Sequence, residues 1–347
     1  MSAPFLLITM IKKILVLTPA WVGDAVMAQP LYRRLQQRHP EAVIDVLAPA
    51  WTAAIHGRMS EIRRVIENPF AHGQLRLRDR YRLGRKLAQE GYQQAIVLPN
   101  SLKSALIPWF AGIPCRTGWV GEMRYGLLND ARKLDKTALP SMLERFLALA
   151  EPPKTTVNKP LPFPILQAKP VSATVLARYG LGLEKTVVAL CPGAEYGPAK
   201  RWPVAHFAAV AQQAVAAGHQ VWIFGSPKDA EFGTAIRELA ALPAVVDLCG
   251  KTTLEEAIDL LACAKVAVCN DSGLMHIAAA LGVPLVALYG SSSPEFTPPL
   301  TERASIMSLN LSCSPCFERV CPLKHTDCLQ QLQPAQVYQQ VEHWLLA

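Results

Sequence analysis

The sequence predicts an α/β protein with two doubly wound, Rossmann-like domains, and three observations support this fold class. Short apolar runs typical of buried parallel strands alternate with helical segments in both halves of the 347-residue chain. Residues 151–170 separate the two series, and their six prolines cannot sustain regular structure. With 51% hydrophobic residues, the chain can bury two cores of about 150 residues each. Because ligands of such sheets bind at the carboxyl ends of the strands, we expect a central cleft between the domains.

Each half shows its own order of strands and helices. In the first half we expect strands at residues 13–18, 42–47 and 95–98, with helices ending near Arg38, beginning after Ser101, and at 141–150. In the second half we expect strands at 186–190, 220–224, 245–248, 266–270 and 285–289, with helices ending at Ala217 and at 229–240, 254–262 and 273–281. The predicted domains are therefore residues 1–165 and 166–333, and a helix at 334–347 could pack back on the first domain.

Positive charge is concentrated in the first half of the chain. Residues 1–165 contain 23 Lys and Arg against 12 Asp and Glu, whereas residues 166–347 contain 12 against 15. The formal charge of +8 thus arises in a basic first domain, which suits an anionic partner. Nucleic acid, an anionic membrane surface and a phosphorylated glycan all fit this balance, as does a basic surface that is only solvated.

The sequence shows no signal for export or for a membrane span. Residues 1–11 are apolar but short, and they lack a preceding basic stretch and a small-residue cleavage site. Met10 could equally be the first residue of the protein. No run approaches the ~20 apolar residues that a spanning helix needs. We therefore expect a cytoplasmic protein that could touch a membrane surface.

The nine cysteines fall into two groups. Five lie singly in apolar surroundings and are typical of small core residues: Cys115, Cys191, Cys249, Cys263 and Cys269. The other four form a C-x2-C-x4-C-x6-C pattern in a loop: Cys313, Cys316, Cys321 and Cys328. Four close thiols could bind zinc or an iron–sulfur cluster, stay reduced, or pair as disulfides. Because the spacing matches no standard metal pattern, we expect no required metal here.

The most informative motif lies in the second half, where residues 266–270 form an apolar run that leads into Asp271-Ser272-Gly273 and an Ala-rich helix. A strand that turns directly into a helix leaves free backbone N–H groups at the helix start, and the helix dipole adds partial positive charge there. Such a turn suits a phosphate group. An ordinary helix with Asp or Ser as its N-cap would give the same pattern.

Lys200-Arg201 follows the strand at residues 186–190, on the same sheet edge as the Ser272 turn. Fixed backbone donors and a mobile charge together suit a diphosphate. The chain has neither a G-x-x-x-x-G-K-[ST] loop nor a G-x-G-x-x-G after its first strand, which disfavours P-loop hydrolases and nicotinamide dehydrogenases.

Asp24 follows the first strand and begins a helix, where the dipole should favour its ionised form. An ionised carboxylate that faces a cleft could accept a proton from an attacking hydroxyl, although an N-cap would look the same. His276 lies one turn into the proposed phosphate helix and could contact a phosphate or face the core.

Three short segments resemble glycosyltransferase family 9, the ADP-heptose:lipopolysaccharide heptosyltransferases. They are Gly23-Asp24, Pro192-Gly193-Ala194 with Lys200-Arg201-Trp202-Pro203, and Asn270-Asp271-Ser272-Gly273-Leu274-Met275-His276. Three longer segments, at residues 98–105, 116–130 and 293–299, resemble the heptosyltransferase II group of this family. The resemblance covers essentially the whole chain and implies the GT-B fold.

The resemblance also implies a reaction. L-glycero-D-manno-heptose would pass from ADP-heptose to the first heptose of the lipopolysaccharide inner core (heptosyl-Kdo2-lipid A), with inversion at the anomeric carbon. Asp24 matches the general base, and Lys200 matches the residue that neutralises the departing diphosphate. The implied donor-binding residues are Gly193, Lys200, Arg201, Asp271, Ser272, Gly273, Leu274, Met275 and His276. Because preorganised donors meet the charge on the diphosphate, no cofactor or metal is expected.

The basic first domain would then bind the anionic acceptor at the cytoplasmic face of the inner membrane of a Gram-negative cell. The expected acceptor-binding residues are Gly23, Asn100, Lys103, Arg116 and Arg124. A further basic cluster could bind the acceptor, lie on a membrane surface or be merely solvated: Arg76, Arg78, Arg80, Arg82, Arg85 and Lys86.

Three alternatives remain at this point. The acceptor position could be that of heptosyltransferase I or III, or the protein could be a sugar-nucleotide epimerase with a similar phosphate site. A nucleic-acid-binding protein would explain the basic half, but the chain has no helix-turn-helix or RNA-binding signature.

Overall fold

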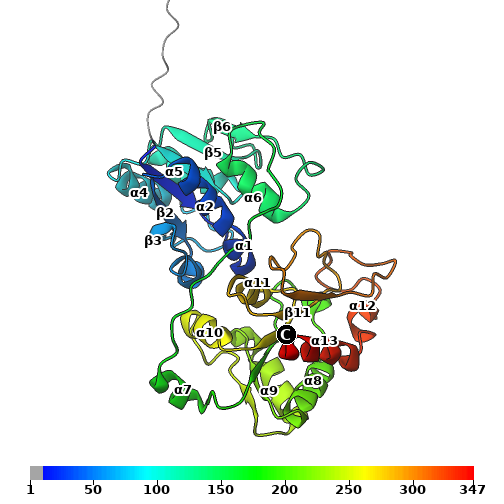
Figure 1. Ribbon diagram of the computed structural model, residues 1–347. Helices are drawn as coiled ribbons and strands as arrows, with labels where there is room; N and C mark the ends of the chain where they lie inside the picture. The colour runs from blue at the N-terminus through cyan, green and yellow to red at the C-terminus, as the bar shows by residue number, and fades with distance from the viewer. Residues whose placement is uncertain (1–10) are drawn as a thin grey trace, which may run out of the picture. The chain divides into compact units, whose positions relative to one another are not determined.

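The computed structural model describes residues 11–347, and its contacts divide the chain into two compact units (Figure 1). Unit 1 contains the described residues up to Ala20 together with Ala28–Pro162, and unit 2 contains Trp21–Met27 and Phe163–Ala347. The apolar residues 1–10 and the alternative start at Met10 lie outside the described residues. Among residues 11–347, no helix is long and apolar enough to cross a bilayer.

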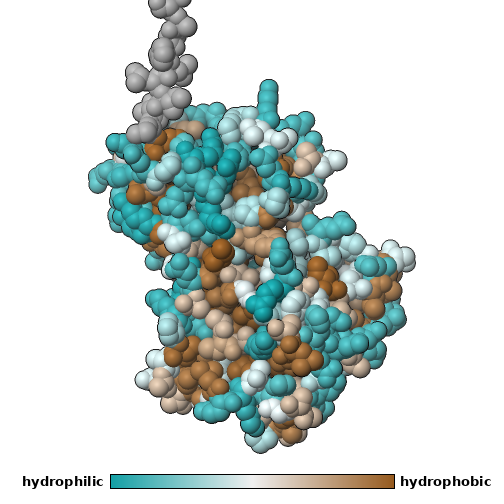
Figure 2. Space-filling view, viewed as in Figure 1, coloured by the Kyte–Doolittle hydropathy of each residue, from teal (hydrophilic) through white to brown (hydrophobic). Residues whose placement is uncertain are grey.

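Unit 1 is a six-stranded parallel sheet in the order β3-β2-β1-β4-β5-β6. Its strands are β1 (Lys13–Leu17), β2 (Val43–Ala48), β3 (Ile62–Glu67), β4 (Gln94–Val97), β5 (Cys115–Trp119) and β6 (Asp130–Arg132). Its helices are α2 (Gln29–Arg38), α3 (Ala53–His56), α4 (Leu77–Ala88), α5 (Leu102–Phe110) and α6 (Met142–Ala150), with a 3-10 turn at Ala50–Thr52. The central strands carry mainly apolar residues because helices cover both faces of such a sheet. Hydrophilic residues dominate the face of this unit that Figure 2 shows, as expected for the outer surfaces of its helices.

Unit 2 is a second six-stranded parallel sheet, in the order β12-β11-β10-β7-β8-β9. Its strands are β7 (Val187–Cys191), β8 (Gln220–Ile223), β9 (Val245–Asp247), β10 (Val266–Asn270), β11 (Leu285–Leu288) and β12 (Ala304–Met307). Its helices are α1 (Val22–Met27), α7 (Ala173–Tyr179), α8 (Val204–Ala216), α9 (Ala230–Ala240), α10 (Leu254–Leu261), α11 (Gly273–Ala280), α12 (Asp327–Gln330) and α13 (Pro334–Leu346). Short 3-10 turns occur at Pro198–Lys200 and Pro227–Asp229.

The strand order of unit 2 defines where its ligand site should lie. From β7 the chain first adds β8 and β9 on one side of the sheet and then β10, β11 and β12 on the other side, which is the strand order of a Rossmann sheet. The direction in which strands are added therefore reverses between β7 and β10. The register pairs Cys269 with Cys191, so the two strands end side by side. Ligands of open α/β sheets bind at this switch point, beyond the carboxyl ends of the strands. The two parallel sheets confirm the predicted α/β class with two Rossmann-like domains.

The helix expected up to Arg38 is in fact two helices, α1 and α2, which belong to different units. Pro30 explains the break, because it has no N–H to donate to the preceding turn and occupies the start of α2. The short helix α1 packs on α11 within unit 2. Asp24 therefore belongs by its contacts to the same unit as Lys200 and Asp271.

The C-terminal helix α13 packs on α8, β10 and β11 of unit 2. Val337, Tyr338 and Val341 join the core formed by these elements. By these contacts α13 belongs to unit 2. The apolar residues of α13 are covered by α8, β10 and β11.

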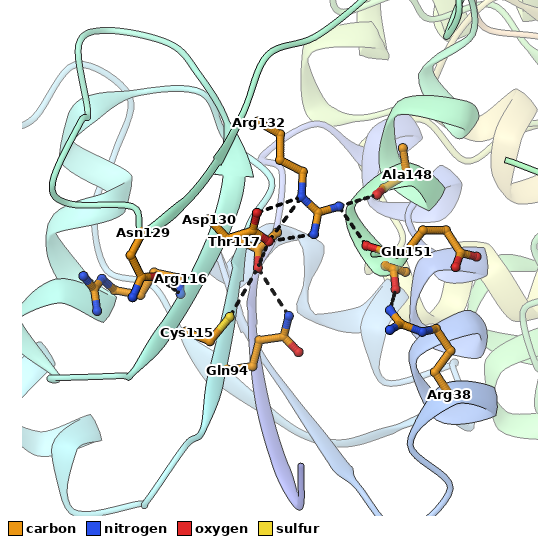
Figure 3. A network of polar contacts seen from close by, with 11 residues as sticks. Arg38, Gln94, Cys115, Arg116, Thr117, Asn129, Asp130, Arg132, Ala148 and Glu151 are labelled. Carbon is orange, nitrogen blue, oxygen red and sulfur yellow. Dashed lines mark hydrogen bonds and ion pairs between the residues drawn. The ribbon is translucent and has the colours of Figure 1, made fainter. Parts of the chain in front are cut away.

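Arginine side chains close the end of α6 in unit 1 (Figure 3). The Arg132 guanidinium donates hydrogen bonds to the carbonyl oxygens of Ala148 and Glu151, at 2.7 and 2.8 Å, and Arg38 donates to the carbonyl of Ala150. Arg132 also pairs with Asp130 at 2.6 Å. The last carbonyls of a helix have no partner within the helix, so these arginines satisfy them. Arg132 thereby attaches α6 to the edge strand β6, and Arg38 attaches it to α2.

Candidate active site

The N-terminus of α11 has no side-chain cap from Ser272. Strand β10 is fully buried and ends at Asn270, and Ser272 occupies the N-cap position with extended backbone angles (φ −150°, ψ 173°). The Ser272 side chain makes no capping hydrogen bond. The ordinary N-cap alternative is therefore not realised for Ser272, and the backbone N–H groups that begin the helix are not capped by that side chain.

Lys200 meets Asp271 at the switch point between β7 and β10. Its Nζ lies 2.6 Å from Oδ2 of Asp271, and the two side chains are only 15% and 5% exposed. Asp271 directly follows β10, and Lys200 ends the 3-10 turn after β7. The structure thus brings together two residues that lie 71 positions apart in the sequence.

Asn270 holds these two segments in place. Its Oδ1 accepts a hydrogen bond from the backbone N–H of Trp202 at 3.1 Å, and its Nδ2 donates to the carbonyl of Pro192 at 2.6 Å. Both partners lie in the loop that carries Lys200, and Asn270 is completely buried. From the sequence alone, Asn270 is singled out only as the first residue of the motif at 270–276. Its amide positions the loop of residues 192–202, which carries Lys200.

Helix α1 presents Asp24 to this group of residues through a very close contact with α11. A methyl group at Gly23 would lie 2.7 Å from Cδ2 of His276, and one at Gly273 would lie 2.6 Å from a methyl carbon of Val22. Only glycine allows the two helices to approach this closely at both points. The approach carries the Asp24 carboxyl into the electrostatic reach of Lys200 and Asp271.

Burial raises the pKa of Asp24 to about 6, with Lys200 opposing the rise and Asp271 adding to it. The sequence had suggested the opposite, because a carboxylate at a helix start is usually stabilised in its ionised form. Desolvation outweighs the dipole at this position. A carboxylate with a pKa near 6 is a stronger base than an ordinary aspartate and is still ionised at neutral pH.

His276 lies against Gly23 and is 4% exposed, and its Nδ1 has no hydrogen-bond partner. Burial lowers the pKa of His276 to about 4, so the imidazole is neutral at pH 7. A neutral imidazole can donate a single hydrogen bond to a ligand but supplies no charge. Unlike Lys200, His276 therefore cannot offer a positive charge to a ligand.

The remaining predicted donor residues lie around the same sheet edge. At Gly193, a side chain would collide with the Asp229 carboxylate. The Arg201 guanidinium lies 4.5 Å from the ring centre of Phe232, and its buried Nε has no partner. Met275 is fully buried with its sulfur 3.5 Å from the Tyr289 hydroxyl, so it and Leu274 can offer a ligand at the helix start only their backbone N–H groups.

Comparison with known proteins shows which family the chain resembles. Residues 80–327 match the family model described as glycosyltransferase family 9 (heptosyltransferase). Lipopolysaccharide heptosyltransferase 2 of Salmonella typhimurium is 51% identical over 86% of this chain and 88% of its own length. Lipooligosaccharide heptosyltransferase 2 of Haemophilus influenzae is 47% identical over 85% and 88%. The solved structure of Escherichia coli ADP-heptose lipopolysaccharide heptosyltransferase II superposes with a TM-score of 0.85 at 45% identity, covering 96% of this chain and 98% of that one.

The chain belongs to glycosyltransferase family 9, the heptosyltransferases. The resemblance to heptosyltransferase II, the expected GT-B fold and the expected enzyme class are thereby confirmed. The alternative of a nucleic-acid-binding protein is not supported.

The expected acceptor residues of this family member are distributed over both units. Gly23 lies in unit 2, whereas Asn100, Lys103, Arg116 and Arg124 lie in unit 1. Lys103 is partly exposed. The half-buried Arg116 donates from Nε and Nη1 to the carbonyls of Leu127 and Ile113, both at 2.6 Å, and its backbone N–H donates to Asn129 (Figure 3).

Arg124 requires a correction. Its side chain is 1% exposed and donates to the carbonyls of Trp119 and Pro99 and to Oδ1 of Asn100. An acceptor could reach this guanidinium only if buried carbonyls lost their partners, which is costly. Arg124 therefore holds the segment after β5 against the segment after β4, and it is not an acceptor contact.

The four clustered cysteines are half-buried and carry no disulfide. They line a small cavity together with Ser291, Ser314 and His325. Backbone N–H groups, with that of Thr326 contributing most, lower the pKa of the Cys321 thiol. Within residues 11–347, no group of three or more His, Cys, Asp or Glu side chains is arranged to hold a metal ion.

Two serines at the end of β11 were missed by sequence reasoning. Ser291 and Ser292 are 2% and 5% exposed, and neither hydroxyl has a hydrogen-bond partner. They follow the strand next to β10 and thus lie on the edge that carries Asp271. A run of three serines in a loop has no distinctive sequence signal, because most such serines are solvated.

The raised pKa of Asp24 predicts that its ionised form costs stability. The carboxyl has a pKa of about 6 in the folded protein against 3.8 for the ordinary group, so folding is weakened above pH 6 and not below pH 4. Asp24→Asn should therefore increase the free energy of unfolding by about 3 kcal/mol at pH 8. Chemical denaturation at pH 8 and pH 4 measures this difference, with the exposed Glu238→Gln as control. An equal effect at both pH values would contradict the prediction.

Proposed function

We propose that this protein is an inverting heptosyltransferase of lipopolysaccharide core biosynthesis. It transfers L-glycero-D-manno-heptose from ADP-heptose to the first heptose of heptosyl-Kdo2-lipid A and requires no cofactor. The observation that carries the proposal is the meeting of Asp24, the Lys200–Asp271 pair and the uncapped α11 N-terminus in one unit. The solved relative titled ADP-heptose lipopolysaccharide heptosyltransferase II, 45% identical over nearly the whole chain, supports the choice of substrates.

The donor would bind at the switch point of unit 2, within the predicted domain 166–333. Its diphosphate would accept hydrogen bonds from the backbone N–H groups of Gly273, Leu274 and Met275 and would meet the Lys200 ammonium. Charge grows on the diphosphate as the bond to the anomeric carbon breaks. Hydrogen-bond donors whose positions are fixed before the reaction stabilise that charge, because the protein does not need to reorganise as the charge develops.

Asp24 would act as the general base. As the acceptor hydroxyl oxygen bonds to the anomeric carbon, its proton passes to the Asp24 carboxylate and ADP departs from the opposite face. Proton transfer of this kind contributes about 10²- to 10⁴-fold to the rate. Burial favours the role, because it places the pKa of Asp24 at about 6, close to the operating pH.

The reaction is tested by measuring ADP release with purified ADP-heptose and acceptors that bear zero, one or two heptoses. We expect turnover with the one-heptose acceptor, and preference for another acceptor would assign the heptosyltransferase I or III position instead. Asp24→Ala should lower kcat by about 10²- to 10⁴-fold. In the wild type, kcat/KM should fall as the pH drops through about 6, because protonated Asp24 cannot accept a proton. A rate that is unchanged in Asp24→Ala would refute the mechanism.

The basic unit 1, within the predicted domain 1–165, would bind the anionic inner core through Lys103 and neighbouring groups. The carboxylates of Kdo and the phosphates of lipid A supply complementary charge. Lys103→Glu should raise the acceptor KM about tenfold and leave the KM for ADP-heptose unchanged. Lys136→Glu, an exposed charge reversal in the same unit, is the control. Steady-state kinetics of both variants, with each substrate varied separately, gives the two KM values. An unchanged acceptor KM in Lys103→Glu would exclude Lys103 from acceptor binding.

Contact with the membrane would use the outer face of α4 and α5. Leu77, Tyr81 and Trp109 are 50%, 51% and 46% exposed, and Tyr81 and Trp109 both contact the Phe110 ring. Exposed cations of α4 accompany these residues: Arg78, Arg82, Arg85 and Lys86. Aromatic side chains with Arg and Lys around them favour an anionic bilayer surface. Arg80 is excluded, because it is 3% exposed and donates to three backbone carbonyls.

Vesicle flotation tests the membrane contact. Replacement of Arg82, Arg85 and Lys86 by Glu should abolish binding to vesicles with about 30% phosphatidylglycerol, since each cation near such a surface contributes about 1 kcal/mol. The matched control replaces the exposed Lys133, Lys136 and Lys154 of the same unit. Equal binding by both triple variants would exclude this face.

A further inference from the structure

The donor site lacks positive charge for its proposed ligand. Lys200 is already paired with Asp271 at 2.6 Å, and Asp24 adds a second carboxylate nearby. The neutral His276 supplies no charge. ADP-heptose brings two negative charges on its diphosphate, so binding calls for a cation beyond Lys200.

Arg319 and Lys200 both lie over the ring of Tyr196. The Lys200 Nζ is 5.1 Å and the Arg319 Cζ 5.0 Å from the centre of this ring. Cations favour such positions because the faces of aromatic rings are electronegative. The cysteine-rich loop, defined here as residues 308–326, thus brings a second cation to the aromatic ring that Lys200 also contacts.

The backbone of Arg319 is fixed to the segment that carries Lys200. The N–H of Ala199 donates to the carbonyl of Arg319 at 3.1 Å, and the hydroxyl of Tyr196 donates to the carbonyl of Phe317 at 2.6 Å. At Gly197, any side chain would collide with the Arg319 carbonyl. The position of Arg319 relative to Lys200 is therefore set by main-chain contacts.

The Arg319 guanidinium itself remains available. The residue is exposed, and within residues 11–347 the structure gives it no carboxylate partner. Arg201 differs, because it is half-buried and its guanidinium donates to the carbonyl of Ala194. An arginine with a fixed backbone and a free planar head suits bidentate binding of a phosphate.

We propose that Arg319 binds the diphosphate of the nucleotide sugar beside Lys200 and stabilises ADP as it leaves. This inference rests on the proposed function, because it takes ADP-heptose as the donor. It gives the cysteine-rich loop a part in donor binding: the loop holds the Arg319 backbone at the site, and the guanidinium bonds to phosphate oxygens.

Isothermal titration of the full chain with ADP and with adenosine tests the proposal. Arg319→Ala should weaken ADP binding about tenfold and leave adenosine binding within twofold of wild type, because adenosine has no phosphate. Arg319→Lys should recover part of the affinity for ADP. Lys324→Ala, which removes another exposed cation of the same loop, is the matched control and should bind ADP as the wild type does.

The outcomes separate this inference from the proposed function. Wild-type protein that fails to bind ADP would refute the proposed function itself. Wild-type protein that binds ADP, together with Arg319→Ala that binds it within twofold as tightly, would refute the role of Arg319 alone. Equal losses for ADP and adenosine would also refute that role, since they would show that the substitution disturbs the site as a whole.

Discussion

The ion pair between Lys200 and Asp271 is the interaction on which the site depends. Both side chains are largely buried, so each charge is tolerable only because the other is present. The pair forms because β7 and β10 are neighbours at the point where the strand order reverses, and Asn270 ties their following segments together. A diphosphate that enters would compete with Asp271 for the Lys200 ammonium. Asp271 would then be released from Lys200 and could accept hydrogen bonds from sugar hydroxyls. Binding of the diphosphate by Lys200 and binding of the sugar by Asp271 would therefore be coupled.

The same pair also shifts the pKa of Asp24, the proposed general base. Lys200 lowers the pKa of Asp24 and Asp271 raises it, while burial makes the largest contribution. Bound diphosphate would add negative charge close to Lys200 and offset part of its effect on Asp24. We therefore expect Asp24 to become a stronger base once the donor is in place. Such coupling would delay proton abstraction from the acceptor until a leaving group is present.

The sequence predicted the parts of the molecule that depend on apolar patterning, and it failed where contacts decide. The buried strands β1, β7 and β10 were found because short continuous apolar runs bounded by loop residues are typical of strands buried on both faces. The edge strands β3, β6 and β12 were missed, because their residues are mostly half-exposed and mix polar with apolar types. Strand β5 was missed as well, because its sequence Cys-Arg-Thr-Gly-Trp is not a continuous apolar run. Arg124 was misjudged since a sequence does not distinguish a guanidinium that faces solvent from one that bonds to buried carbonyls. The pKa of Asp24 was misjudged because burial depends on the packing of α1 against α11, which lies far along the chain.

The cysteine-rich loop is held in place by residues that lie between its cysteines. The four clustered thiols left metal binding, reduced thiols and disulfides as alternatives, yet the contacts that place the loop come mainly from its backbone. The N–H of Phe317 donates to the carbonyl of Ser291 at 2.6 Å, and the Ser314 hydroxyl donates to that of Gly290. Both carbonyls follow β11, on the sheet edge that carries Asp271, and Ala199 holds the other side of the loop. Because the loop is attached to two segments that also carry the proposed donor site, its backbone and that of the Lys200 segment are positioned together.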